Sequence, residues 1–240
     1  MCTVSFVPVG EKILICSNRD EKSARGIAFA PITTITPSGH QLIFPKDPDA
    51  GGTWISLKEN GDVAVLLNGG FENHVPQYPY SKSRGLIFLA VFESSNPLEA
   101  FKSIELSGIE PFTLVLFVGG FLHVCRWDAI SKHAKQLNEQ QPHIWSSVTL
   151  YDAATRAKRA YWFHDWLSTN PSPTIQDLLS FHRFAGDGDH GNDLLMNRNN
   201  ALFTVSITGI ETGKSALVMQ YFDLLQHKNY LSSFAAHAIS

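Results

Sequence analysis

The sequence predicts an α+β fold dominated by antiparallel β-hairpins. Four pairs of β-rich runs are each separated by a short turn containing glycine, which is typical of hairpins. The helical segments are fewer and fall between the hairpins. Hydrophobic residues make up 44% of the 240 residues, so we expect one domain over residues 1–240. A four-layer αββα sandwich, with two antiparallel sheets between helices, would bury this much apolar strand.

The first predicted hairpin joins residues 3–9 to residues 12–17 through a turn at Gly10-Glu11. A two-residue turn at this point places Arg19 directly opposite Cys2. Directly opposed residues share one face of a sheet, with Cβ atoms roughly 5 Å apart. The simplest register therefore brings a guanidinium beside a thiol.

Three more hairpins follow along the chain. Their predicted turns lie at Asn60-Gly61, at Gly119-Gly120 and near Glu211–Gly213. The strands flanking Gly119-Gly120 are almost continuously apolar, which indicates that both of their faces are covered.

Asn68 is a second candidate site residue. A two-residue turn at Asn60-Gly61 places Thr53 opposite Asn68, with glycine pairs next to both residues. Glycines at such strand ends allow a ligand to approach the backbone closely. Asn68 or a neighbouring N–H group could then donate to an oxyanion. Two ordinary glycine-rich turns are the alternative interpretation.

Helices are predicted in three places, and a fourth segment is ambiguous. Asn96 and Pro97 are typical of a helix start, and that helix should run to about Leu106. Residues 152–168 predict an amphipathic helix, and residues 174–184 a short one. Residues 84–94 are ambiguous, because their length favours a buried helix and their composition suits a strand. Residues at helical spacing in the 152–168 segment are Ala153, Ala157, Ala160, Tyr161 and His164.

Composition excludes several classes of protein. A net charge of -3 provides no basic field for nucleic acid. No stretch reaches the roughly 18 apolar residues of a membrane span, and no signal peptide is recognisable. The cysteines Cys2, Cys16 and Cys125 are too few and too scattered for a disulfide framework or a zinc knuckle. We therefore expect a cytoplasmic protein without a metal site.

The chemistry of the first hairpin is coherent for a nucleophile. A nearby cation lowers the pKa of a thiol from its usual value of about 8.5. Removal of Met1 would give Cys2 a free α-amine with a pKa near about 8, which could accept the thiol proton. Asp20 could orient this amine or Arg19. The alternative is a solvated polar turn after a strand.

Five segments together resemble the NRDE family, also called the transport-and-Golgi-organisation family. They are MCTVSF at the start, NRDE at 18–21, GGTW at 51–54, SRG at 83–85 and TVSIT at 204–208. The resemblance implies a fold similar to the N-terminal-nucleophile hydrolases. Cys2 matches the nucleophilic cysteine of the bile-salt and penicillin-acylase-like members of that fold. Their Arg-Asn-x-Asp segment is matched loosely and in permuted order by Asn18, Arg19, Asp20 and Glu21.

The resemblance also implies a function and a set of site residues. NRDE proteins are implicated in haem trafficking and in lipid or acyl-CoA homeostasis, so we expect binding and trafficking of a hydrophobic small molecule, with haem the leading candidate. The alternatives are acyl-CoA-like binding and an amidohydrolase acting on a linear or acyl amide. An enzyme would use Cys2, Arg19, Asp20 and Asn68; the ligand-binding set is Cys2, Asn18, Arg19, Asp20, Glu21, Trp54, Asn68 and Arg84.

No cofactor is required by either function. No Cys-x-x-Cys-His segment is present, so haem would be non-covalent cargo. His74, His123 and His143 are candidate axial ligands, although a lone histidine is more often structural. Transient contact with a membrane or a haem protein would accompany such a role.

Overall fold

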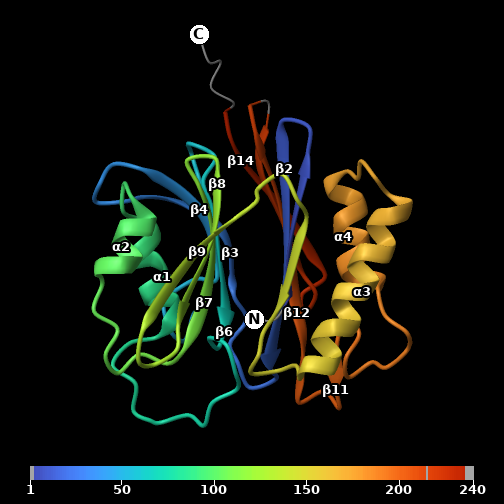
Figure 1. The fold of residues 1–240 in the computed structure, drawn as a ribbon, viewed down its shortest axis with the longest axis horizontal. Helices are drawn as coiled ribbons and strands as arrows, with labels where there is room; N and C mark the ends of the chain where they lie inside the picture. The colour runs from blue at the N-terminus through green and yellow to red at the C-terminus, as the bar shows by residue number, and fades with distance from the viewer. Residues whose placement is uncertain (1–2, 215, 236–240) are drawn as a thin grey trace. The chain divides into compact units, whose positions relative to one another are not determined.

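The computed structural model describes residues 3–214 and 216–235 (Figure 1). Two antiparallel sheets and four helices are present, which confirms the predicted α+β class. The chain forms two compact units, one from Met1–Arg25 with Gln140–Ser240 and one from Gly26–Glu139. The first unit is therefore built from both ends of the sequence. One domain over residues 1–240 stays a prediction.

The first unit contains a seven-stranded antiparallel sheet in the order β10-β1-β2-β12-β13-β14, with β11 paired to β12. Helices α3 (Ala153–Thr169) and α4 (Ile175–Phe184) lie along one face of this sheet (Figure 1). Its strands are β1 (Thr3–Val9), β2 (Lys12–Lys22), β10 (His143–Ser146), β11 (Asn197–Arg198), β12 (Leu202–Gly213), β13 (Ala216–Asp223) and β14 (Lys228–Phe234).

The second unit contains a seven-stranded antiparallel sheet whose strands follow the chain order β3-β4-β5-β6-β7-β8-β9. Helix α1 (Arg84–Phe92) packs on β6, and α2 (Pro97–Ser103) packs on β7. The strands are β3 (Phe29–Ile35), β4 (Gln41–Lys46), β5 (Ile55–Lys58), β6 (Val63–Asn68), β7 (Phe112–Val118), β8 (Phe121–Trp127) and β9 (Lys132–Leu137).

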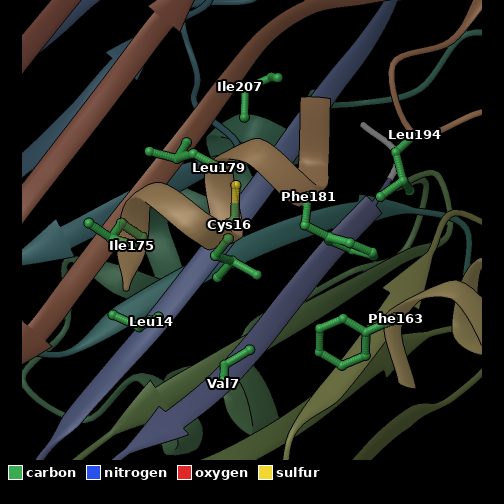
Figure 2. Close-up of a cluster of buried hydrophobic side chains, with 10 residues drawn as sticks. Val7, Leu14, Cys16, Phe163, Ile175, Leu179, Phe181, Leu194 and Ile207 are labelled. Carbon is green, nitrogen blue, oxygen red and sulfur yellow. The ribbon is translucent and has the colours of Figure 1, made fainter. Parts of the chain in front are cut away.

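The core of the first unit lies between its sheet and its helices. Helix α4 packs on β2 and β12, and its capping box joins Thr174 to Asp177. The buried cluster takes side chains from β1, β2, β12, α3, α4 and the segment after α4 (Figure 2). Its members are Val7, Leu14, Cys16, Phe163, Ile175, Leu178, Leu179, Phe181, Leu194 and Ile207. This cluster holds β1 and β2 rigidly beneath the helices.

Two hairpins have the predicted two-residue turns. In the first, Val9 pairs with Lys12 and Thr3 pairs with Asn18, and Gly10 has a φ of +59°. In the hairpin of β7 and β8, Val118 pairs with Phe121 across the Gly119-Gly120 turn. The left-handed backbone of such turns explains why glycine stands there.

The predicted turns of the other two hairpins are wrong in detail. In the second, Lys58 N–H donates to Asp62 O, so the loop has three residues and ends at Gly61, whose φ is +88°. The longer loop shifts the register by one residue. The predicted position of Asn68 opposite Thr53 is therefore wrong, and on its other side Asn68 pairs with Phe112 of β7. In the fourth hairpin, the pairing of β12 with β13 continues to Gly213 and Ala216, past the predicted turn.

The three predicted helices form, and the ambiguous segment 84–94 contains the helix α1. Helix α2 ends at Ser103, three residues before the expected end. The predicted apolar face of α3 is wrong, because Tyr161 and His164 are exposed while Arg159 and Phe163 are buried. The sequence pattern misled because an arginine occupies the centre of the buried face.

The GGTW and SRG segments meet in the second unit. A Cβ atom at Gly52 would lie 2.4 Å from the carbonyl carbon of Gly85, and a Cβ atom at Gly85 would lie 2.9 Å from Thr53 O. Both positions therefore need glycine, because the start of α1 packs directly on the 52–53 backbone. This contact gives both motifs a structural role.

Candidate functional site

The first hairpin places Arg19 at the end of the confirmed register. The pairs run from Val9 with Lys12 to Thr3 with Asn18, and Cys2 lies outside the described residues. The opposition of Cys2 and Arg19 therefore stays a prediction. Arg19 is only 3% exposed and lies 3.8 Å from the Glu21 carboxylate. A buried guanidinium thus stands one position beyond the last described pair.

The NRDE side chains divide between the two faces of β2. Asn18 and Asp20 point to the face that carries α3 and α4, because Asn18 contacts His182 of α4 and Asp20 contacts Tyr151. Side chains alternate along a strand, so Arg19 points to the opposite face. Asn18 and Asp20 are therefore separated from Arg19 by the sheet itself.

Asp20 is a buried carboxylate held by two hydroxyl groups. The Tyr151 hydroxyl donates to Oδ2 at 2.6 Å, and the Thr204 hydroxyl donates to Oδ1 at 2.6 Å. Asp20 is 2% exposed, and Thr204 pairs with it across β2 and β12. Both oxygens accept short hydrogen bonds, and these hydrogen bonds offset the free-energy cost of removing the carboxylate from water. This arrangement fixes the end of β2.

Asn18 belongs to a buried chain with His182 and Ser5. The Asn18 amide nitrogen donates to His182 O at 3.1 Å and to Leu194 O at 2.6 Å, so its Oδ1 must accept. His182 Nδ1 lies 2.8 Å from that oxygen and is therefore the protonated nitrogen. His182 Nε2 then accepts from the Ser5 hydroxyl at 2.7 Å.

Burial keeps this histidine neutral. His182 is 0% exposed, and desolvation, followed by the nearby charge of Arg159, lowers its pKa to about 3. A neutral imidazole satisfies both of its neighbours, whereas an imidazolium would lose the hydrogen bond from Ser5. The chain is therefore a structural anchor between β1, β2 and α4.

Arg159 forms a second anchor on the same face. It is 0% exposed, and its guanidinium carbon lies 3.6 Å from the centre of the Tyr151 ring. It donates to the Thr3 hydroxyl oxygen, to Asn192 O at 3.1 Å and to Asp193 O at 2.6 Å. Sequence reasoning missed Arg159, because nothing in a helical pattern distinguishes a buried arginine from an exposed one. His182 had a signal, since it lies four residues after Leu178 on the apolar face of α4.

The other predicted ligand-binding residues lie in the second unit. Trp54 is 3% exposed, and its carbonyl accepts from Leu66 N–H at 2.8 Å. Asn68 is half-buried at the end of β6. Arg84 begins α1 and forms an ion pair with Glu110 at 3.1 Å. The GGTW contact with Gly85 brings Trp54 and Arg84 into one neighbourhood of this unit, and the ligand-binding role of all three stays a prediction.

The three candidate axial histidines are half-buried or buried, and His74 Nδ1 is buried without a hydrogen-bond partner among the described residues. His74 Nε2 lies 3.3 Å from a Glu110 oxygen, and the His143 ring stacks on Trp145 at 5.6 Å. His123 is 8% exposed, and desolvation lowers its pKa. Within residues 3–214 and 216–235, no three His, Cys, Asp or Glu side chains gather as a metal site requires. The role of a histidine in haem binding stays a prediction.

The two described cysteines are buried thiols. Cys16 is 0% exposed, and burial raises its pKa well above the usual value. Cys125 is also 0% exposed, and burial raises its pKa to about 12. Both thiols stay protonated at neutral pH, so neither is a nucleophile.

Among the described helices, none has the length and apolarity that crossing a membrane demands.

Comparison with solved structures shows the fold. Penicillin V acylase from Agrobacterium tumefaciens is 12% identical with a TM-score of 0.60, and 97% of this chain and 86% of that chain are covered. An N-acylethanolamine-hydrolyzing acid amidase ortholog from Caenorhabditis elegans is 13% identical with a TM-score of 0.57, and the match covers 87% of this chain and 92% of that chain. A conjugated bile acid hydrolase variant from Clostridium perfringens is 12% identical with a TM-score of 0.59, and the match covers 97% of this chain and 92% of that chain. This variant has alanine in place of a cysteine. The predicted N-terminal-nucleophile-hydrolase-like fold is confirmed by these three structures.

Comparison of the sequence alone identifies a family. No curated protein matches the sequence. The family model described as Transport and Golgi organisation 2 (TANGO2) matches residues 1–185, a span that includes the NRDE, GGTW and SRG segments. The chain belongs to the Transport and Golgi organisation 2 family, as its motifs predicted.

Proposed function

We propose that this chain is an N-terminal-cysteine amidohydrolase that uses Cys2 to cleave a linear or acyl amide. The observation that carries this proposal is the confirmed register of β1 and β2, which runs up to Thr3 and Asn18 and leaves Arg19 buried at the next position. Of the three cysteines in the sequence, Cys16 and Cys125 are unsuited to this chemistry because burial keeps their thiols protonated, so the proposal rests on Cys2.

The names of the structurally similar proteins support the same chemistry. They are an acylase, an amidase and a bile acid hydrolase. The bile acid hydrolase was solved once with a cysteine replaced by alanine and once with an arginine replaced by leucine. Those are the two residue types that the first hairpin is predicted to oppose.

The proposed reaction has two steps. The Cys2 thiol transfers its proton to the α-amine, and the thiolate sulfur attacks the carbonyl carbon of the amide. The C–N bond then breaks, the leaving nitrogen takes the proton from the α-ammonium group, and an acyl thioester remains. Water attacks the thioester carbon while the α-amine takes one of its protons, and the C–S bond breaks to release the carboxylic acid. The α-ammonium group then returns its proton to the thiolate, which restores the thiol and the free amine. Arg19 favours the thiolate.

Mass spectrometry and thiol labelling test this function. The intact mass of protein from its native source should correspond to a chain beginning at Cys2. Iodoacetamide at pH 7 should label Cys2 alone, with Cys16 and Cys125 as internal unreactive controls. Arg19→Gln should slow this labelling about tenfold, because loss of the cation raises the thiol pKa by about one unit. Arg183→Gln, which removes an exposed arginine of the same unit, is the matched control.

Hydrolysis of small amides completes the test. Penicillin V, an N-acylethanolamine and a conjugated bile acid are the first probes, since the structurally similar proteins are named for them. Cys2→Ala should abolish any turnover. Retention of Met1 in native protein, or labelling of Cys2 no faster than that of Cys16, contradicts the proposal.

A second candidate is the binding and trafficking of a hydrophobic small molecule, with haem first and an acyl-CoA-like ligand next. The description of the family as transport and Golgi organisation favours it. Such a carrier would work in the cytoplasm and deliver its ligand by transient contact with a membrane or a haem protein. Titration with haem should give a saturable Soret change that is reduced in one of the variants His74→Ala, His123→Ala or His143→Ala. A non-saturable change contradicts haem carriage, and a parallel titration with an acyl-CoA tests the other ligand.

A further inference from the structure

Arg159 carries a buried charge that forms no ion pair with any carboxylate of the described residues. It is 0% exposed, and its partners are the Thr3 hydroxyl oxygen, two backbone carbonyls and the face of Tyr151. A guanidinium without an ion pair is costly to bury. An apolar residue at this position of α3 would avoid the free-energy cost of burying a charge. We therefore look for the role of Arg159 in the hydrogen bonds that it makes.

The two carbonyl groups that hold Arg159 are themselves fixed. Asn192 N–H and Asp193 N–H both donate to Asp189 O, at 2.7 Å and 2.8 Å, and the Asp193 carboxylate accepts from Asp187 N–H at 2.9 Å. A Cβ atom at Gly186 would lie 2.2 Å from that carboxylate, so the loop closes tightly on itself. The guanidinium is therefore held in one position by a compact loop.

Arg159 reaches both strands of the first hairpin. Directly, it donates to Thr3, the first described residue of β1 and the one that follows Cys2 in sequence. Indirectly, it lies on the ring of Tyr151, whose hydroxyl donates to Asp20 next to Arg19. The two contacts thus fall on the neighbours of the two residues that the reaction requires.

We propose that Arg159 is a positioning residue which, by holding Thr3 and Tyr151, raises the reactivity of the Cys2 thiol. This inference rests on the proposed amidohydrolase function. Arg159 touches no reacting atom in it. Its action passes through Thr3 on β1 and through Tyr151 to Asp20 on β2.

Ser5 supplies a matched comparison within the same strand. It lies two residues further along β1, points to the same face, is 0% exposed and hydrogen-bonds to a helix side chain, His182. Ser5→Ala and Thr3→Val therefore each remove one hydroxyl contact between β1 and a helix, and Thr3→Val also removes the 3.1 Å contact of the Thr3 hydroxyl with the Ser146 hydroxyl on β10. Only Thr3 adjoins Cys2, so only its loss should change the reactivity of the thiol.

The test measures the pH dependence of Cys2 labelling by iodoacetamide in the full chain, at a temperature where circular dichroism shows every variant folded. Thr3→Val should raise the pH midpoint by about half a unit or more and slow labelling at pH 7 about threefold or more. Thr3→Ser, which keeps the hydroxyl, should restore the midpoint, and Ser5→Ala should leave it unchanged. Arg159→Lys should shift it in the same direction as Thr3→Val.

The outcomes separate this inference from the function on which it rests. If wild-type Cys2 is not labelled, the proposed function fails, and the wild-type protein alone shows it. If wild-type Cys2 is reactive but Thr3→Val and Ser5→Ala give the same midpoint, Arg159 has only a structural role. If Thr3→Val does not fold, Thr3→Ala takes its place and should raise the pH midpoint in the same way. A midpoint equal to that of Ser5→Ala would then overturn the proposal.

Discussion

The buried neutral state of His182 predicts that the protein loses stability in acid. Desolvation, with a smaller contribution from the charge of Arg159, lowers the pKa of His182 to about 3. In the unfolded chain a histidine has a pKa of about 6.5. Between these values the unfolded chain binds a proton that the folded chain does not, so stability present at neutral pH falls as the pH is lowered through this window.

The magnitude follows from the difference between the two pKa values. The free energy of unfolding changes by about 1.4 kcal/mol per pH unit inside the window. Lowering the pH from 7 to 5 should therefore remove about 2 kcal/mol through His182 alone. In His182→Gln this contribution is absent, so the variant should lose about 2 kcal/mol less than the wild type over the same range.

Urea denaturation at pH 7, 6 and 5, followed by circular dichroism, measures this difference. The variant is less stable than the wild type at pH 7, because glutamine cannot keep both the Ser5 and Asn18 hydrogen bonds, but only the change with pH enters the comparison. His164→Gln removes an exposed histidine from the same unit and is the control. Equal acid losses in the wild type and His182→Gln refute the reasoning.

Three further substitutions test the fold by thermal or urea denaturation. Gly52→Ala should cost about 3 kcal/mol, because its Cβ atom would lie 2.4 Å from the Gly85 carbonyl carbon, whereas Gly191→Ala, with only ordinary contacts, should change stability by less than about 0.5 kcal/mol. Gly119→Asn should be tolerated and Gly119→Val should cost about 1–2 kcal/mol, since Gly119 has a φ of +58° in open space. Phe163→Ala should cost about 3–5 kcal/mol, because the ring is fully buried in the core of Figure 2. The close contact at Gly52 is contradicted if Gly52→Ala and Gly191→Ala change stability equally. The left-handed backbone at Gly119 is contradicted if the asparagine and valine variants are equally stable, and the buried position of Phe163 is contradicted if Phe163→Ala leaves stability unchanged.

Hairpins were predictable wherever the turn chemistry was unambiguous. Gly10 and the Gly119-Gly120 pair give two-residue turns, and the strands beside them have the predicted register. Asn60-Gly61 is also a strong turn signal, but Glu59 joins the loop and Gly61 takes the left-handed position after a tight turn. Such a one-residue difference moves every later pair, which is why Asn68 was placed against the wrong partner.

The candidate site was only partly predictable, because its anchors come from distant parts of the chain. NRDE could be recognised as a motif. The alternation of side chains along a strand then places Arg19 on one face of the sheet and Asn18 and Asp20 on the other face. Their partners are on α4, on the segment before α3 and on β12, and only the folded chain brings these together. A buried arginine such as Arg159 runs against the usual composition of a helix core, so periodicity pointed to the wrong face of α3.

The most direct test of the proposed function is to trap the acyl-enzyme. The full chain is mixed with an N-acylethanolamine, quenched in acid within seconds and digested, and the peptide that contains Cys2 is weighed. We predict a mass increase equal to the acyl group on that peptide, its absence in Cys2→Ala, and its loss as the free acid accumulates. Release of the free acid by Cys2→Ala at the wild-type rate, or the absence of both adduct and product with every acyl amide tried, would contradict the assignment of Cys2 as the nucleophile.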